Sequence, residues 1–142
     1  MNVKINFPIL LVRETDGYMT VTSSETEYGI CSGVAIKKGY FDNILIIDAY
    51  GYSFYVEGVN SKRPFNKSWK WIVELLQYNS ILYKVDLSVQ ATGKLQLSNI
   101  KDLVLKNMKK NSMDWDSGVG VDELEIEISN AKTPKEIIEL LE

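Results

Sequence analysis

The chain has 142 residues, of which 45% are hydrophobic and 25% charged, and its formal net charge at pH 7 is −3. These values are typical of a globular protein rather than a disordered or fibrous one, and the length fits a single domain over residues 1–142. No apolar run approaches the roughly 18 residues that a membrane-spanning helix needs, and no secretion signal is evident. We therefore expect a cytoplasmic protein with no membrane attachment.

The sequence contains no histidine and one cysteine, Cys31. Without histidine there is no Ser-His-Asp or Cys-His catalytic triad and no histidine-ligated zinc site. A single cysteine cannot form an internal disulfide, and we expect Cys31 to be a small buried residue. An enzyme would have to use carboxylates, lysines, tyrosines or an oxygen-ligated metal. The sequence selects none of these groups, so we predict a non-enzymatic protein with no cofactor and no metal.

The first sixty residues carry the patterns of β-strands separated by turns. The tripeptide TDG, residues 15–17, predicts a hairpin turn in which glycine takes the positive φ. The nearly continuous apolar run within residues 43–51 predicts a central strand. Strands are predicted over residues 4–14, 17–23, 32–39, 43–51 and 52–59.

The second half of the chain alternates between helical and strand periodicity. Helices are predicted over residues 65–79, 98–111 and 133–141, the second capped by Ser98 and the third by Thr133, with Glu136 closing a capping box. Strands are predicted over residues 81–91 and 124–128. We expect the α+β class, with a mainly antiparallel sheet of about six to seven strands and three helices on one face. The other face of such a sheet can remain wet and dock a partner.

The segment MDWDSGVGVDELEIEI, residues 113–128, resembles the start of a calcium loop. Asp114, Asp116 and Glu125 match positions one, three and twelve of that template. Position five is Gly118, which has no ligand oxygen, and position six is Val119, which resists the sharp turn made there by glycine. The alternating sequence after the loop also predicts a strand, whereas a calcium loop runs into a helix. We therefore favour a glycine-rich loop and a strand that exposes Glu123, Glu125 and Glu127.

Charge is distributed unevenly along the chain. Residues 61–110 carry ten basic and three acidic side chains, whereas residues 111–142 carry two basic and nine acidic ones. Either the two regions pack together and neutralise each other, or they form separate patches. An acidic patch with one aromatic anchor would suit a basic protein partner. The predicted partner-binding residues are Asp114, Trp115, Asp116, Asp122, Glu123, Glu125 and Glu127.

The basic segment 62–71 provides an alternative. Its positive side chains lie between Phe65, Trp69 and Trp71, a combination that can bind single-stranded nucleic acid by stacking and phosphate contact. The candidate residues are Lys62, Arg63, Lys67 and Lys70. Trp69 also fits the apolar stripe of the predicted helix, which would place it in the core. The overall acidity and the absence of a recognised motif argue against nucleic-acid binding.

In size and character the chain resembles the small immunity proteins of bacterial polymorphic and contact-dependent toxin systems. The resemblance covers the general profile of the chain and includes no diagnostic motif. It implies a cytoplasmic antitoxin-type inhibitor that neutralises a basic toxin domain, in some cases a nuclease, by tight stoichiometric binding. A nucleic-acid-associated regulatory protein and an enzyme that uses carboxylates remain the alternatives.

Overall fold

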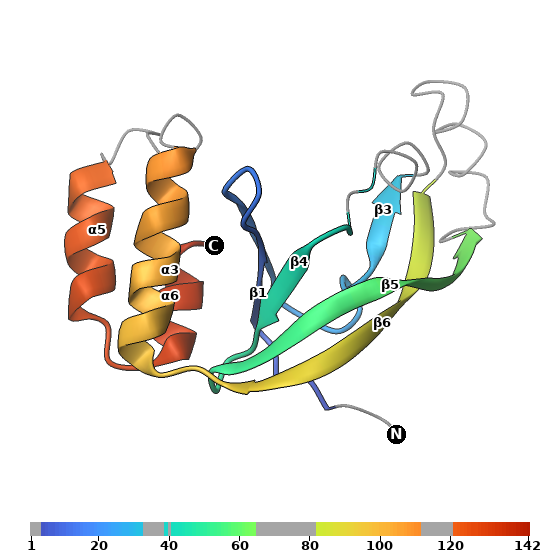
Figure 1. Cartoon of the computed structure of the whole chain (residues 1–142), viewed down its shortest axis with the longest axis horizontal. Helices are drawn as coiled ribbons and strands as arrows, with labels where there is room; N and C mark the ends of the chain where they lie inside the picture. The colour runs from blue at the N-terminus through green and yellow to red at the C-terminus, as the bar shows by residue number, and fades with distance from the viewer. Residues whose placement is uncertain (1–3, 33–38, 40, 65–81, 112–120) are drawn as a thin grey trace.

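The structure is a computed structural model that describes residues 4–32, 39, 41–64, 82–111 and 121–142 (Figure 1). It confirms the α+β class, with one antiparallel sheet and three helices in the described part. The strands are β1 (Ile9–Arg13), β2 (Tyr18–Thr22), β3 (Ile30–Ser32), β4 (Ile44–Ile47), β5 (Tyr52–Pro64) and β6 (Leu82–Lys94). The helices are α3 (Leu97–Lys110), α5 (Val121–Asn130) and α6 (Pro134–Leu140).

The six strands form one sheet in the order β2-β1-β4-β5-β6-β3, and every neighbouring pair is antiparallel. β4 lies between β1 and β5, which confirms the predicted central strand. The predicted hairpin turn is also present: Gly17 has φ +77° and donates its N–H to the Arg13 carbonyl over 2.9 Å. A β-carbon at this position would lie 2.6 Å from Lys110 Cβ, so glycine also lets the turn approach α3.

The β5–β6 hairpin is much longer than the sequence predicts and is strongly bent (Figure 1). β5 continues to Pro64, whereas the predicted strand ends at residue 59. The register between the two strands shifts at three places, near Ser53, Glu57 and Asn60. Each extra residue bends its strand and increases the local twist. The far part of the hairpin therefore curves away from the helices.

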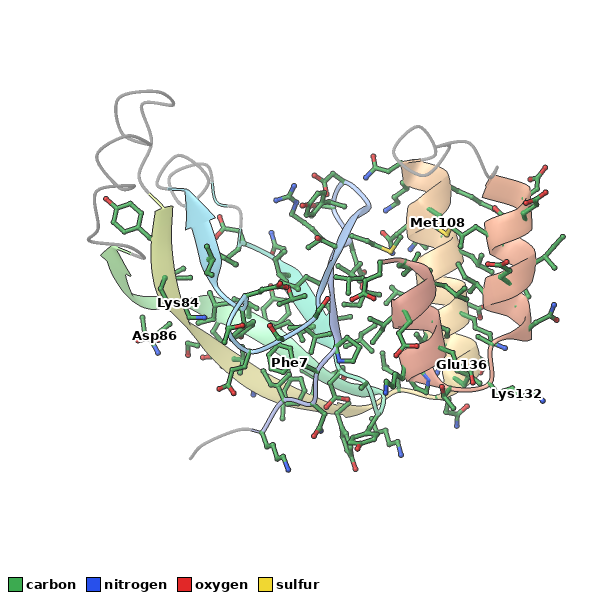
Figure 2. The ribbon with its side chains drawn as sticks, turned by 180° about the vertical axis from the view of Figure 1, so that it is seen from behind. Phe7, Lys84, Asp86, Met108, Lys132 and Glu136 are labelled. Atoms are coloured by element: carbon green, nitrogen blue, oxygen red, sulfur yellow. The ribbon has the colours of Figure 1, made fainter. Side chains whose placement is uncertain are left out.

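The helices pack on one face of the β2-β1-β4 part of the sheet, as predicted (Figures 1 and 2). β1 and β4 send alternate side chains toward them, because successive residues of a strand point to opposite faces. Burial of each large aliphatic side chain stabilises the fold by roughly 1.5–3 kcal/mol. This helix-side core consists of Leu10, Val12, Met19, Ile47, Ile100, Val104, Met108, Ile128, Ala131, Ile137, Ile138 and Leu141.

A second core lies on the opposite face of the same strands. Ile5 and Phe7 pack over it, and the Phe7 ring meets the Tyr28 ring edge-on with centroids 5.8 Å apart. The expected wet face is therefore wrong for β1 and β4, whose side chains are buried on both sides. The buried members of this inner core are Ile9, Leu11, Phe41, Ile44, Ile46, Phe54, Val56 and Val85.

The strand predicted over residues 81–91 is confirmed as β6, and one of its faces points inward. Val85 is buried, and the other three residues of that face pack partly buried against the inner core. Those three residues are Tyr83, Leu87 and Val89. The side chain of Cys31 and the helix predicted over residues 65–79 lie outside the described residues. Of the strand predicted over residues 32–39, only Ser32, where β3 ends, and Gly39, which lies in a turn, are described.

Two helix caps can be compared with prediction. α3 begins one residue earlier than expected: its N-cap is Gln96, without a side-chain cap, and Ser98 lies inside the helix, so the predicted Ser98 cap is wrong. The Thr133 cap is confirmed, because its Oγ1 accepts the N–H of Glu136 over 3.2 Å. The Glu136 carboxylate accepts the N–H of Lys132, one residue before the cap, over 2.9 Å.

Candidate functional site

The strand predicted over residues 124–128 is wrong: these residues belong to helix α5, Val121–Asn130. Five alternating residues are too few to separate the two periodicities, since Leu124 and Ile128 are also spaced four apart, as on one side of a helix. Asp122 and Glu123 stand in the first turn, where negative charge is favourable. The three residues Asp114, Trp115 and Asp116 lie outside the described residues.

The helix changes which side chains face the solvent. Ile128 is fully buried and Leu124 packs partly buried against the helix-side core, whereas Ile126 is 62% exposed. Asp122 is four residues before Ile126 and Glu123 is four residues before Glu127, so the four side chains lie together on one side of α5. All three acids are exposed, and Glu125 is half-buried at the flank. We call Asp122, Glu123, Ile126 and Glu127 the α5 outer face.

The position of α5 is fixed by its inner side. Ile128 packs into the helix-side core with residues of α3 and α6. Lys101 of α3 donates from its Nζ to the carbonyl of Ser129 over 2.8 Å, and Ser129 Oγ donates to the Glu125 carbonyl over 2.9 Å. The α5 outer face is therefore carried by a rigid helix rather than by a loop.

The acids of the α5 outer face have no cationic partner in the described part of the chain. The ion pairs found there join Arg13 to Asp16 at 2.8 Å and Lys135 to Glu139 at 3.8 Å. The acidic C-terminal region does pack against α3 of the basic region, but through the apolar helix-side core. The charge distribution left open whether the basic and acidic regions neutralise each other or form separate patches. Among the described residues, no ion pair joins α3 to α5.

Carboxylates also line a shallow hollow of about 430 Å³ between α5 and α6. Glu136 is held there by the Lys132 N–H, and Glu139 faces Lys135 in the ion pair above. Within the described residues no three acidic or cysteine side chains are grouped closely enough to hold a metal ion. The hollow is lined by Glu127, Asn130, Ala131, Glu136, Glu139 and Leu140.

The helical assignment of α5 bears on the calcium template. One objection to a calcium loop, the strand after it, no longer holds, because residues 121–130 are helical. The other objection stands in the sequence: Gly118 offers no side-chain ligand and Val119 replaces the glycine of the turn. Both positions lie outside the described residues.

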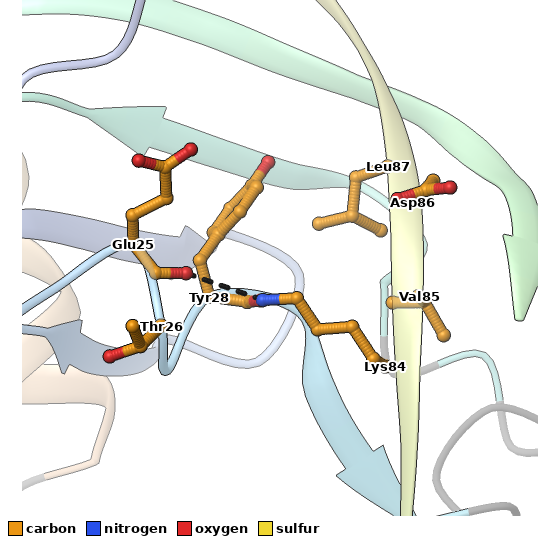
Figure 3. A pocket seen from close by; sticks show the side chains of 7 residues that line it. All are labelled: Glu25, Thr26, Tyr28, Lys84, Val85, Asp86 and Leu87. Atoms are coloured by element: carbon orange, nitrogen blue, oxygen red, sulfur yellow. Dashed lines mark hydrogen bonds between the residues drawn. The ribbon is translucent and has the colours of Figure 1, made fainter. Parts of the chain in front are cut away.

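A larger hollow, of about 720 Å³, lies where the turn at residues 24–29 meets β6 (Figure 3). Lys84 Nζ donates there to the carbonyls of Tyr28 and Glu25, the latter over 3.3 Å. Burial raises the pKa of Tyr28 to about 12. The residues that line this β6 hollow are Glu25, Thr26, Tyr28, Lys84, Val85, Asp86 and Leu87.

A third hollow, of about 410 Å³, is bordered by Tyr50 of the β4–β5 turn and by Tyr52, the first residue of β5. Tyr50 is 62% and Tyr52 45% exposed, and Lys94 Nζ lies 5.4 Å from the Tyr52 ring centroid. Asp48 is fully buried below the turn, and its Oδ1 accepts the N–H groups of both tyrosines over 2.9 Å. The buried carboxylate therefore fixes how the tyrosines are presented.

The alternative nucleic-acid site is only partly described. The backbones of Lys62 and Arg63 belong to β5 and pair with Val85 and Lys84 of β6. Their side chains, together with Lys67 and Lys70, lie outside the described residues.

Sequence reasoning missed Ile126, Tyr50, Tyr52 and Lys84. A helix prediction for residues 121–130 would have indicated that Ile126 is exposed. In a helix Ile126 lies on a different side from Leu124 and Ile128, whereas in a strand all three share one face. Lys84 is brought to its hollow by the pairing of β6 with β3, and the two tyrosines are positioned by the buried Asp48. The sequence carries no local signal for either arrangement.

Comparison of the chain with protein-family models, curated proteins and solved structures finds no match. In the described part of the chain, no helix has the length and apolar character required to cross a membrane.

Proposed function

We propose that the chain is a protein-binding domain of the immunity type, which neutralises a basic toxin domain by forming a stoichiometric complex with it. The observation that carries this proposal is the α5 outer face, where an isoleucine that is 62% exposed is surrounded by three exposed acids. A partner that buried Ile126 would gain roughly 1.5–3 kcal/mol from its side chain.

The acids around Ile126 supply the complementary electrostatics. Asp122, Glu123 and Glu127 are free of internal ion pairs in the described part of the chain. Their field therefore acts on an approaching basic surface and accelerates association, an effect that salt weakens. An amphipathic helix face with an apolar anchor is a common way to occupy the groove of another protein.

Affinity capture with matched variants tests the proposal. The tagged chain and its Ile126→Asp and Glu123→Lys/Glu127→Lys variants are incubated with lysate of the source organism at moderate salt. Asp102→Lys serves as the control, because Asp102 is an exposed acid on a different helix, α3. We expect one stoichiometric basic polypeptide that the wild type and Asp102→Lys retain and the other two variants lose.

The captured polypeptide is then purified and tested for toxicity and for association kinetics. We expect the chain to suppress its toxicity at a one-to-one ratio. Glu123→Lys/Glu127→Lys should slow association at least tenfold at low salt, with a smaller effect at high salt. A polypeptide that all four chains retain equally would remove the α5 outer face from the interface. Captured nucleic acid without a protein would favour the alternative function.

A further inference from the structure

In the described part of the chain, the outer edge of β6 has no paired strand over most of its length. β3 pairs only with Leu82–Lys84, and the next contact beyond it is the 2.9 Å hydrogen bond from the Val85 N–H to the Gly29 carbonyl. From Asp86 onward, no strand of the described chain lies along this edge (Figure 1). An unpaired strand edge is a template for pairing with another chain unless a protein blocks it.

The direction of the backbone groups along this edge follows from the Val85 contact. The Val85 N–H points away from β5, toward Gly29. β6 has no skipped residue between Val85 and Ala91, so its N–H and C=O groups alternate regularly between the two sides. Leu87 and Val89 therefore also direct their backbone groups outward. Among the described residues, neither receives a partner on that side.

The β6 hollow begins where this open edge begins (Figure 3). Its walls are the apolar side chains of Val85 and Leu87 and the carboxylates of Glu25 and Asp86. Among the described residues that line it, the one amine is Lys84, and it already donates to two backbone carbonyls. A strand that entered the hollow would meet apolar surface on one side and negative charge on the other.

We propose that the β6 edge at Asp86–Ala91 binds an extended basic segment of another protein as an added antiparallel strand. Leu87 and Val89 would exchange backbone hydrogen bonds with it, as in other cases of strand addition. Its alternate side chains would be apolar, toward Leu87, and basic, toward the exposed carboxylate of Glu25. A second copy of this chain fits less well, because its own β6 edge carries the same Glu25 carboxylate and an amine that is already engaged.

This site is independent of the proposed function. Lys84 and Asp86, which line the β6 hollow, lie at the end of the molecule opposite the helices (Figure 2). Ile126→Asp should abolish toxin capture and leave binding at the β6 edge unchanged, so failure of either proposal is visible without the other.

The test uses a displayed library of random twelve-residue peptides selected against the full chain, followed by synthesis of the enriched peptides. We expect sequences that alternate basic and apolar residues and bind at a one-to-one ratio. Glu25→Lys should weaken binding at least tenfold, whereas Glu27→Lys, an exposed acid of the same turn that does not line the hollow, should change it less than twofold.

Amide hydrogen exchange locates the bound peptide. In the free chain, the amides of Leu87 and Val89 should exchange at least tenfold faster than those of Asp86 and Ser88, which face β5. Peptide binding should slow the first pair selectively. Ala91→Pro removes an outward N–H at an exposed position and should weaken binding, whereas Ala91→Ser keeps the donor and should not.

Three outcomes would overturn the proposal. The first is a library that yields no enriched peptide, or only acidic ones. The second is a bound peptide that protects amides elsewhere and leaves Leu87 and Val89 unchanged. The third is a dimer of the chain alone that Ala91→Pro dissociates, in which case the occupant of the edge is a second copy.

Discussion

The side chains of Asn6 and Asp48 are joined across 42 residues of sequence, with Asn6 Nδ2 donating to Asp48 Oδ2 over 2.9 Å. The other carboxylate oxygen accepts the N–H groups of Tyr50 and Tyr52. One buried carboxylate thus ties the N-terminal segment to the β4–β5 turn.

Replacing this carboxylate should destabilise the fold. Asp48→Ala leaves several donors without their acceptor, and we expect it to lower the free energy of unfolding by about 3 kcal/mol. Asp48→Asn retains one acceptor oxygen and should cost less. Urea denaturation measures both, with the exposed Asp102→Ala as control. A loss below about 0.5 kcal/mol in Asp48→Ala would show that the hydrogen bonds are dispensable.

The helical phase of α5 can be tested with two isoleucines. Ile128 is fully buried and Ile126 is 62% exposed. Ile128→Ala should lower the free energy of unfolding by about 3 kcal/mol, because it leaves a cavity in the helix-side core. Ile126→Ala should change it by less than about 0.5 kcal/mol. Similar losses for both, measured by urea denaturation, would instead fit a strand that buries the two side chains on one face.

At acidic pH, the free energy of unfolding should lose the contribution of the ion pair between Arg13 and Asp16. The hydrogen bond from Arg13 lowers the pKa of Asp16 below its usual 3.8. A lowered folded-state pKa contributes stability above the unfolded value and loses it as the pH falls through the folded value. Asp16→Asn should therefore cost roughly 0.5 kcal/mol above pH 5 or so, since the pair is largely exposed. The difference from wild type, measured by urea denaturation, should shrink below pH 3.8.

At alkaline pH, stability should decrease through ionisation of Tyr28, whose pKa is raised by burial from 10.0 to about 12. The unfolded chain loses this proton first, so stability is complete below pH 10 and declines between 10 and about 12. Partial exposure limits the loss to less than about 2 kcal/mol. Tyr28→Phe should remove this part of the alkaline decline in urea denaturation. Phenolate absorbance should also lose a group that titrates near pH 12. An unchanged titration curve would contradict the assignment.

The class of the fold was predictable from local patterns, because α3, α6 and the β1–β2 turn each carry their own signals. Pairing between distant residues was not. The extension of β5 to Pro64 and the pairing of β3 with β6 depend on contacts across many residues. The alternating pattern of residues 124–128 led to a strand prediction, although Leu124 and Ile128 are also spaced as in a helix. Only the packing of these two residues against α3 and α6 decides between the two structures.

The candidate site was predictable in its charge but not in its anchor. Asp122, Glu123 and Glu127 were selected as exposed acids and are exposed. Ile126 was not selected, because in the strand interpretation it lies on the face opposite Glu123, Glu125 and Glu127. The open edge of β6 was invisible in the sequence, since it depends on where β3 ends.

β1 separates the two cores and belongs to both. Leu10 and Val12 pack in the helix-side core, whereas Ile9 and Leu11 pack in the inner core. Deleting or inserting one residue at the start of this strand would turn each following side chain of β1 from one core to the other. Replacing one aliphatic residue of β1 by another alters the packing of one core only. A one-residue insertion or deletion in β1 would alter the packing of both cores at once. We expect natural variants of this protein to differ in residue type along β1 and to preserve its length.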